Sequence, residues 1–452
     1  MNASSESGGG RIGSLDDLLD YFRSGETPLE DWRIGTEHEK IGVYLESGKR
    51  VSYEGERGIG ALLERLAEVD GWEIVREGEK AVALLKEGAS ITLEPGGQIE
   101  LSGAPLRTIR ETCREFNHHV ELVKRVSEDF GIAWLGLGLD PLHGVADIPK
   151  MPKVRYDIMR DYLPAQGRHA LLMMHATATV QANYDYSDEA DMVSKMRTAM
   201  ACTPIVSAIF ANSSLSLGRE NDFVSKRVEI WRDVDPERCG LLHFVFEPDF
   251  GYRRYAEWAL DVPMFFVVRD HHYIPAQGTT FRRFLREGFA GHEAALEDWD
   301  LHLTTLFPEV RLKRIIEVRG ADVVPRGLVC ALPALWKGVL YDLEACEAAW
   351  RLVSAWSLEE REAALTEAAR GGLSARVAGR PVLELAGELT DISAEGLRRI
   401  FERGGTDADE RRFLDPVREQ LALGKSPGQE ILDLWRGDWS GSVERLIEYT
   451  RY

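Results

Sequence analysis

Apolar and polar residues alternate along several stretches of the chain, with the period of two that is typical of β-strands. The run from Asp31 to Leu45, DWRIGTEHEKIGVYL, predicts one strand in which Glu37 and Glu39 lie on the same face. The segment SITLEPGGQIELSGAP predicts a β-hairpin, because a Pro-Gly-Gly turn separates two short strand-like runs. Glu94 comes directly before this turn and Glu100 follows it. Four carboxylates are thereby expected on strands.

Two later runs predict strands with a polar face. ATATVQANYDY alternates so that four polar side chains point one way: Thr177, Thr179, Gln181 and Asn183. VRLKRIIEVRGAD, residues 310–322, predicts a further strand in which Lys313, Glu317 and Arg319 share a direction. Polar faces on strands are candidate functional surfaces.

Steps of three and four between apolar residues predict helices elsewhere. PLRTIRETCREFNHHVELVKRV favours a helix with Pro105 in its first turn, and the segment after TVQANYDY favours a helix capped by Ser187 and disturbed near Pro204. From about Glu344 onward the pattern is mostly helical. No linker-like tract divides the chain, so the fold class expected is α+β. We expect a disordered polar tail over residues 1–13 and a single domain over 14–452 with a helical C-terminal part.

Composition narrows the function. The 452 residues are 44% hydrophobic and 29% charged, as in ordinary folded proteins. The 75 acidic and 55 basic residues give a net charge of −20, which disfavours nucleic-acid and anionic-membrane partners. The opening residues lack the apolar region of a secretory signal peptide, and no run approaches the roughly 18 apolar residues of a membrane span. These features predict a cytoplasmic protein. The five cysteines contain no C-x-x-C pair, which argues against a zinc ribbon.

The acids suggest a metal-dependent chemistry. Carboxylate oxygens are the ligands that Mg²⁺ prefers, usually together with substrate phosphates. The five candidate ligands all sit on predicted strands or beside a turn: Glu37, Glu39, Glu94, Glu100 and Glu317. The alternative for any one of them is an ordinary exposed carboxylate, but the set as a whole favours a metal site.

A basic group adjoins the last of these acids. Arg319 would lie beside Glu317, where a guanidinium can stabilise a phosphoryl group in transfer, and Lys313 and Arg311 extend the basic side as candidate ATP-binding residues. The alternative is a cross-strand ion pair. Neither a P-loop nor a complete dinucleotide fingerprint occurs, so an ATP site here would be of another kind.

Long motifs in the chain resemble the plant-type glutamate–cysteine ligases that plants share with many bacteria. They include RIGTEHEKIGV, LEPGGQIELSGAPLRTIRETCREFNHHVELVK, MPKVRYDIMRDYLP, TVQANYDYSDEADM and RLKRIIEVRGAD, and the resemblance covers nearly the whole chain. It implies a glutamine synthetase-like fold with a curved antiparallel sheet flanked by helices. It also implies ATP-dependent joining of the glutamate γ-carboxylate to the amine of cysteine through a γ-glutamyl phosphate, the first step of glutathione biosynthesis. The substrates would be glutamate, cysteine and ATP, with Mg²⁺ as cofactor, in a monomer or homodimer.

The resemblance also assigns residues. It implies that the five acids hold magnesium, that Arg319 faces the transferred phosphate, and that Arg227, Trp231 and Gln181 contact substrate. Cys113 and Cys330 resemble a family pair capable of forming a redox disulfide. The segment HATATVQAN departs from the usual context at His175, Ala176 and Ala178, which leaves open a sister ligase that uses another amine. A non-catalytic homologue that binds nucleotide or glutamate is a second alternative.

Overall fold

The computed structural model describes residues 10–452, so most of the expected polar tail, residues 1–9, lies outside the described part of the chain. At the centre is a nine-stranded sheet with the order β14-β15-β7-β1-β5-β4-β3-β2. The ninth strand, β6, pairs with the second half of β1, after the part of β1 that pairs with β5. Every pairing in this sheet is antiparallel. Its strands are β1 (Ile34–Tyr44), β2 (Glu73–Glu77), β3 (Lys80–Lys86), β4 (Ala89–Leu93), β5 (Ile99–Ser102), β6 (Ile132–Leu135), β7 (Thr179–Tyr184), β14 (Val310–Leu312) and β15 (Ile316–Asp322).

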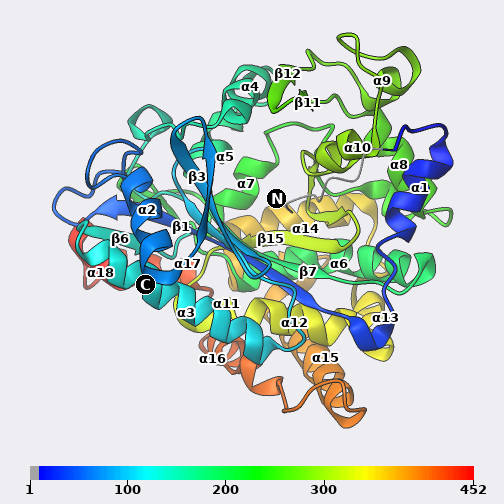
Figure 1. The fold of residues 1–452 in the computed structure, drawn as a ribbon. Coiled ribbons are helices and arrows are strands. Elements are labelled where there is room, and N and C mark those ends of the chain that lie inside the picture. Colours follow the sequence, from blue (N-terminus) through cyan, green and yellow to red (C-terminus); the bar gives the residue numbers. More distant parts are fainter. Residues whose placement is uncertain (1–9) are drawn as a thin grey trace.

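Helices cover the sheet and form the C-terminal part of the chain (Figure 1). The helices before β14 are α1 (Leu15–Arg23), α2 (Ile59–Asp70), α3 (Ile109–Glu128), α4 (Val154–Tyr162), α5 (Ala170–Ala176), α6 (Glu189–Ile209), α7 (Lys226–Trp231), α8 (Tyr252–Asp261), α9 (Phe281–Glu287) and α10 (Leu296–Leu303). Those after β15 are α11 (Arg326–Val329), α12 (Ala331–Leu340), α13 (Leu343–Val353), α14 (Leu358–Gly371), α15 (Val382–Glu402), α16 (Asp415–Leu423), α17 (Pro427–Arg436) and α18 (Val443–Thr450). Four two-stranded pairings complete the fold: β8 (Leu215–Ser216) with β9 (Arg219–Glu220), β10 (Cys239–Gly240) with β13 (Phe307–Pro308), β11 (Phe266–Arg269) with β12 (His272–Pro275), and β16 (Arg376–Val377) with β17 (Arg380–Pro381).

The two faces of β1 have different neighbours. His38 stacks edge-on against Phe116 of α3, with ring centroids 4.7 Å apart. Because successive side chains of a strand point to opposite faces, Glu37 and Glu39 must point away from α3. In Figure 1, α3 and α12 lie below the central strands and α7 lies above them. The acidic face of β1 is therefore the face toward α7.

The strand at residues 310–322 is the main difference from the expected elements. It is two strands, because Lys313–Ile315 form a turn that folds β14 back onto β15. Arg311 consequently lies directly opposite Glu317. No glycine or proline marks this turn, so the alternation alone predicted one continuous strand.

Three smaller expectations are also corrected. The helix after Pro105 begins at Ile109, since Thr108 is its N-cap and accepts a hydrogen bond from the backbone of Glu111. The cap of α6 is Asp188, not Ser187, and the helix runs through Pro204 without a break. Around Pro204, α6 is buried between the sheet and the C-terminal helices, and this packing keeps the helix continuous. A proline removes only one backbone donor, so packing on this scale can maintain the helix.

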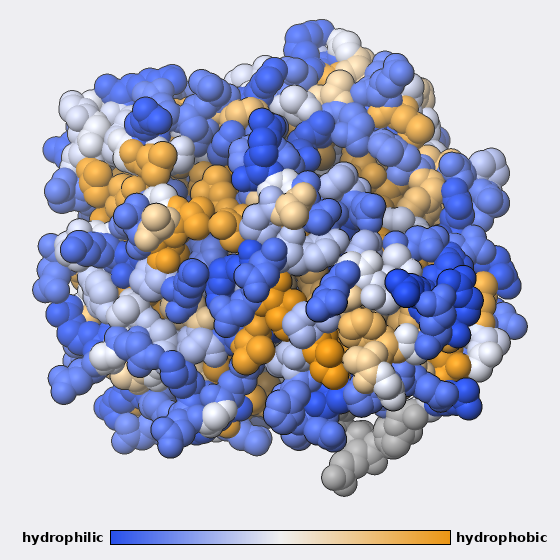
Figure 2. All heavy atoms as spheres, turned by 90° about the horizontal axis from the view of Figure 1, so that it is seen from above, coloured by the Kyte–Doolittle hydropathy of each residue, from blue (hydrophilic) through white to orange (hydrophobic). Residues whose placement is uncertain are grey.

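The sheet and helices confirm the α+β class. Apolar residues of the sheet, α6 and the C-terminal helices form one extended core, and a second cluster lies between α2, β3, α5 and the far end of the sheet. Within residues 10–452, no helix has the length and apolar character needed to cross a bilayer. Figure 2 shows apolar atoms in separate patches among polar ones on the face seen from above.

Candidate active site

One face of the central sheet carries most of the predicted site residues. Glu39 lies opposite Glu100, and Glu37 lies opposite Gln181. Farther along, Glu317 lies opposite Asn183. Directly opposed residues of antiparallel strands place their side chains on the same face, about 5 Å apart. Strands β5, β1, β7 and β15 therefore bring these polar groups together.

A bulge in β15 extends this polar face. The register shifts between Val318 and Ala321, so the alternation of side chains reverses across Arg319 and Gly320. Arg319 remains on the acidic face, and Asp322 joins it. The Asp322 carboxylate accepts hydrogen bonds from the Ser213 hydroxyl at 2.7 Å and the Ser225 hydroxyl at 2.9 Å. Since Ser225 caps α7, this aspartate fixes the start of that helix against the sheet.

The Pro-Gly-Gly turn that carries Glu94 is held tightly in place. The buried Arg50 guanidinium donates to the Gly96 carbonyl at 2.6 Å and pairs with Asp140 at 2.8 Å. A Cβ atom at Gly96 would lie 2.1 Å from the His175 carbonyl oxygen, so only glycine allows this contact with α5. The turn is therefore a rigid support for Glu94.

Glu317 is surrounded by cations. Its carboxylate accepts two 2.8 Å hydrogen bonds from Arg311, lies 3.2 Å from Lys313 Nζ, and pairs with Arg319. Although burial alone would raise the pKa of this fully buried carboxyl, Arg311, Lys313 and Arg319 hold it well below its usual range. Glu317 is an anion at neutral pH and anchors three positive side chains.

The other four acids lack such partners. Among the described residues, none of them lies within 4 Å of a Lys or Arg nitrogen: Glu37, Glu39, Glu94 and Glu100. Their few hydrogen bonds come from neutral donors, such as the Thr92 hydroxyl to Glu100 at 2.6 Å and the Thr179 N–H to Glu39 at 2.9 Å.

The protonation of these four acids reflects that environment. Burial, and then repulsion from Glu317 and Glu100, raises the pKa of Glu37 to about 7. Burial and the neighbouring carboxylates raise the pKa of Glu39 well above its ordinary value, and burial is the main cause of the raised pKa of Glu94 and of Glu100. Desolvated, mutually repelling carboxylates of this kind are stabilised by a bound cation.

The donors are of the right type for magnesium, although they are not already drawn together. Within residues 10–452, no three His, Cys, Asp or Glu side chains converge closely enough to form a complete metal cluster. Mg²⁺ usually takes one or two carboxylates and completes its shell with water and phosphate oxygens. The spread arrangement fits that mode of binding.

A cationic wall stands at the other end of the face. Arg319 Nη1 donates to Gln181 Oε1 at 2.6 Å, and its guanidinium lies 5.8 Å from the centre of the Trp231 ring. Arg227, 4% exposed, donates through Nη2 to the Arg319 carbonyl at 3.0 Å. Its Nε and the Trp231 Nε1 are buried without a hydrogen-bond partner in the described part of the chain. These groups are available to an anionic ligand.

The two predicted ATP-binding cations differ in availability. Arg311 donates every N–H group inside the protein, to Glu317 and to the Thr304 and Leu306 carbonyls at 2.8 and 2.9 Å. Its contacts make it a support for Glu317. Lys313, whose side chain is 21% exposed, can reach solvent and a ligand.

The structure adds residues to the site beyond those to which the sequence assigned a role. Glu309 is 8% exposed, and burial raises its pKa although Arg227 and Arg319 act in the opposite direction. Lys153 is buried near Glu94, where its Nζ donates to the Leu93 carbonyl at 2.9 Å. Asn183 donates to Glu37 at 3.2 Å. The polar face of TVQANYDY signalled Asn183, whereas Glu309 and Lys153 lie in segments without a diagnostic period.

The unusual residues of HATATVQAN are buried. Ala176 and Ala178 are fully buried in the apolar core, while Thr179 and Gln181 face the acids. His175 sits at the end of α5 beside Gly96. The replacements therefore alter the packing around the site, in α5 and at the start of β7.

Cys113 and Cys330 form a disulfide with a Cα–Cα distance of 5.7 Å. The bond joins α3 to the junction between α11 and α12, on the side of the sheet opposite the acids. Whether it responds to redox conditions stays a prediction.

Comparisons with known proteins agree on one family. The model of glutamate–cysteine ligase family 2 matches residues 33–449. A chloroplastic glutamate–cysteine ligase of Medicago truncatula is 44% identical over 440 residues, which cover 96% of this chain and 85% of that relative. The Arabidopsis thaliana enzyme of the same name is 43% identical over 440 residues, or 97% and 83% of the two chains. The crystal structure of a Francisella tularensis glutamate–cysteine ligase in complex with AMP has a similar fold, with a TM-score of 0.57 at 12% identity, over 93% of this chain and 87% of that one.

These comparisons contradict the cytoplasmic location predicted from the sequence. The plant relatives are chloroplastic proteins. The prediction was wrong because it rested on the absence of an apolar leader, which distinguishes only secretory signal peptides; plastid transit peptides have no such region.

Proposed function

Because the chain belongs to glutamate–cysteine ligase family 2, we propose that its acidic sheet face is where ATP drives the joining of glutamate to cysteine. The product is γ-glutamylcysteine. One observation carries the assignment of the site: four carboxylates without a cation, two of them buried and two part-buried, lie on the same sheet face as Arg319. The AMP bound by the structurally similar Francisella ligase supports a nucleotide substrate.

We propose magnesium as the cofactor, held by Glu37, Glu39, Glu94 and Glu100 in groups of one or two carboxylates. Their raised pKa values and lack of ion pairs support this role. Bound magnesium would supply positive charge to the phosphate oxygens. Glu317, predicted as a fifth ligand, is better suited to hold Arg319, because both of its oxygens already bind cations.

The protein's own cations then divide the chemistry. A γ-carboxylate oxygen of glutamate attacks the terminal phosphorus of ATP, and ADP leaves; the cysteine amine attacks the resulting acyl phosphate, and phosphate leaves. We assign Arg319 to the phosphoryl oxygens, because Glu317 and Gln181 fix its guanidinium. Preorganised charge of this kind stabilises the transition state without reorganisation. We assign Arg227 to the α-carboxylate of glutamate, with Trp231 beside it.

Cysteine is the acceptor that the plant relatives favour. The three residues that depart from the family context, His175, Ala176 and Ala178, are buried and present no exposed group to an amine. The sister-ligase alternative therefore has no support from the site itself.

The experiment is an assay of ADP release with glutamate and Mg²⁺ against a panel of amines, with the product identified by mass spectrometry. Cysteine should give rapid release and γ-glutamylcysteine. Release with another amine, and none with cysteine, would establish a sister ligase. Nucleotide binding without release under any condition would establish a non-catalytic homologue. Sedimentation of the same preparation tests the predicted monomer or homodimer.

A further inference from the structure

Glu309 is a buried acid of the active site to which the proposed mechanism gives no role. In the ladder of β14 and β15, Arg311 lies opposite Glu317. The Arg319 N–H donates to the Glu309 carbonyl at 3.1 Å, so the ladder continues with Glu309 opposite Arg319. Because side chains alternate along a strand, Glu309 points to the same face as Arg311. Its carboxylate is thereby directed to the polar face of the sheet.

The Glu309 carboxylate has no partner in the protein. The residue is 8% exposed, and within residues 10–452 its side chain has neither an ion pair nor a hydrogen bond. Burial raises its pKa, and Arg227 and Arg319 act in the opposite direction. Both guanidiniums bind other acceptors: Arg319 pairs with Glu317 and donates to Gln181, and Arg227 donates to the Arg319 carbonyl. An unpaired buried anion is unfavourable, so a cationic ligand group would stabilise Glu309.

The other acids that act on Arg227 already have contacts or a proposed role. Burial lowers the pKa of Arg227, and Asp322, Glu309 and Glu39 raise it. Asp322 accepts hydrogen bonds from two serine hydroxyls. Glu39 accepts one from a backbone N–H and is a proposed magnesium ligand. Glu309 is therefore the acid beside Arg227 that is free to bind a substrate group.

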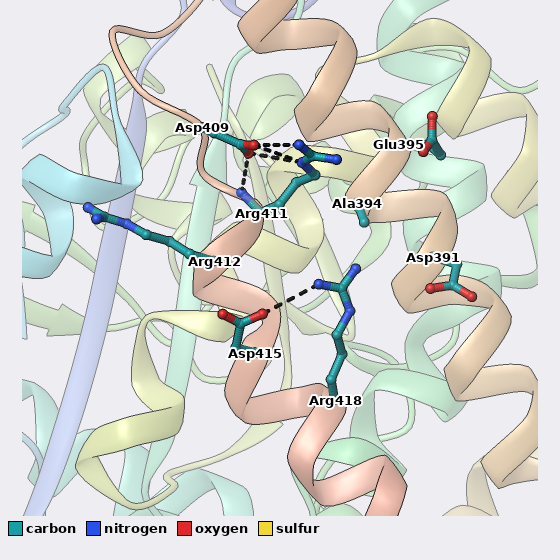
Figure 3. Close-up of a pocket in the computed structure, with 8 residues that line it drawn as sticks. All are labelled: Asp391, Ala394, Glu395, Asp409, Arg411, Arg412, Asp415 and Arg418. Atoms are coloured by element: carbon teal, nitrogen blue, oxygen red, sulfur yellow. Dashed lines mark hydrogen bonds and ion pairs between the residues drawn. The ribbon is translucent and has the colours of Figure 1, made fainter.

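A cavity between α15 and α16 shows the opposite arrangement of charges. It has a volume of about 420 Å³ and is lined mainly by charged side chains. There Arg411 donates to both oxygens of Asp409, and Arg418 lies 3.4 Å from Asp415 (Figure 3). These four side chains satisfy one another and need no ligand. At Glu309 and Arg227, by contrast, an anion and a cation are neighbours without pairing.

We propose that Glu309 binds the α-ammonium group of glutamate and thereby makes the site selective for an α-amino acid; this inference rests on the proposed ligase function. An α-amino acid carries its carboxylate and its ammonium on one carbon, so neighbouring side chains of opposite charge are needed to bind both. Arg227 is assigned to the carboxylate, and its Nε has no partner in the described residues. Glu309 supplies the opposite charge, because a carboxylate accepts strong charge-assisted hydrogen bonds from an ammonium.

The test compares glutamate with glutarate, which has the same two carboxylates but no amino group. Titration calorimetry with Mg²⁺ and a non-hydrolysable ATP analogue measures the affinity of the protein for each, and ADP release with cysteine measures kcat and KM. Wild-type protein should prefer glutamate. Glu309→Gln should weaken glutamate binding and raise its KM about 10- to 100-fold, with a smaller change in kcat. Glutarate should bind equally well or more tightly, because Arg227 loses a neighbouring anion.

Two further variants separate recognition from support of the pocket. Glu309→Asp keeps the charge on a shorter side chain, so it should lose less of the preference for glutamate, and it takes the place of Glu309→Gln if the amide variant does not fold. Glu362 of α14 also acts on Glu309, but its side chain is 37% exposed and pairs with Arg232 at 3.0 Å. Glu362→Gln is therefore a matched loss of charge, and it should keep the wild-type preference.

The ratio of glutamate to glutarate affinity decides the result, because a purely structural acid would not change it. An unchanged ratio in the Glu309 variants would overturn the proposal, as would equal losses for the two ligands, an equal effect of Glu362→Gln, or wild-type protein without a preference for glutamate. Calorimetry requires no turnover. Wild-type protein that binds glutamate selectively through Glu309 but releases no ADP would refute the ligase activity alone, whereas ADP release with an unchanged ratio would refute this inference alone.

Discussion

Glu317→Gln should be among the most destabilising single changes on the sheet, although it removes only one charge. The carboxylate is fully buried and neutralises three cations. Without it, Lys313 can turn toward water, but Arg311 and Arg319, whose side chains are 8% and 10% exposed, would remain charged and buried. Removing one member of a buried ion pair costs about 3–5 kcal/mol, and with two guanidiniums left uncompensated we expect a value near 5 kcal/mol.

The assay is urea unfolding followed by circular dichroism at pH 8 in EDTA, with Glu100→Gln as the matched control. Glu100 is on the same face and is also buried, at 9% exposed, but it has no cation, and burial raises its pKa. An amide at this position removes an unfavourable charge and can still accept the Thr92 hydrogen bond. We therefore expect the control to change the free energy of unfolding by less than about 1 kcal/mol, or to raise it. Equal losses in the two variants would refute the reasoning, because burial rather than cation pairing would then govern both sites.

Three further outcomes are expected. Arg319→Ala should lower kcat about 100- to 1,000-fold, with little loss of stability because Glu317 keeps its other cations. Arg319→Lys should restore little of the activity, because an ammonium lacks the planar guanidinium fork. Wild-type ADP release in either variant would exclude the role. Arg227→Ala should raise the KM for glutamate far more than that for ATP, by the factor that corresponds to about 2–5 kcal/mol, whereas a purely structural arginine would shift only the melting temperature. Folding raises the pKa of Glu37 from 4.5 to about 7, so the stabilising effect of its protonated form is full below pH 4.5 and is lost as pH rises through 7. In EDTA the free energy of unfolding should fall by roughly 3 kcal/mol between these pH values. The fall should be smaller in Glu37→Gln, and Mg²⁺ should oppose it. A flat profile would contradict this last expectation.

The parts of the fold that depend on local alternation could be predicted from the sequence. The strand of Glu37 and Glu39, the hairpin between Glu94 and Glu100, and the polar side of the Gln181 strand are all present. In each case the signal is local: apolar and polar residues alternate along consecutive positions, or glycines mark a turn. The direction of these side chains then follows from the strand geometry alone.

Features that depend on distant contacts could not be predicted in this way. The turn between β14 and β15 consists of Lys, Arg and Ile, residues without turn preference, and it exists because Arg311 must return to face Glu317. Arg227 reaches the Arg319 carbonyl from a helix 92 residues earlier in the chain. Four of the acids have no ion pair, whereas Glu317 has three cations around it. This difference also depends on how distant segments pack together.

The bulge in β15 has a consequence for how this strand tolerates insertion and deletion. One additional residue at Arg319–Gly320 lets both Arg319 and Asp322 point toward α7, and Gly320 fits there because a Cβ atom would lie 2.7 Å from Thr203 of α6. Deleting that residue would restore a regular ladder and turn Asp322 toward the apolar core, away from Ser213 and Ser225. The number of residues in this strand is therefore constrained. A substitution along it changes one side chain, whereas an insertion or deletion of one residue would exchange the polar and apolar faces of the strand from the bulge onward. A designer who transplants this active site must carry the irregularity with it.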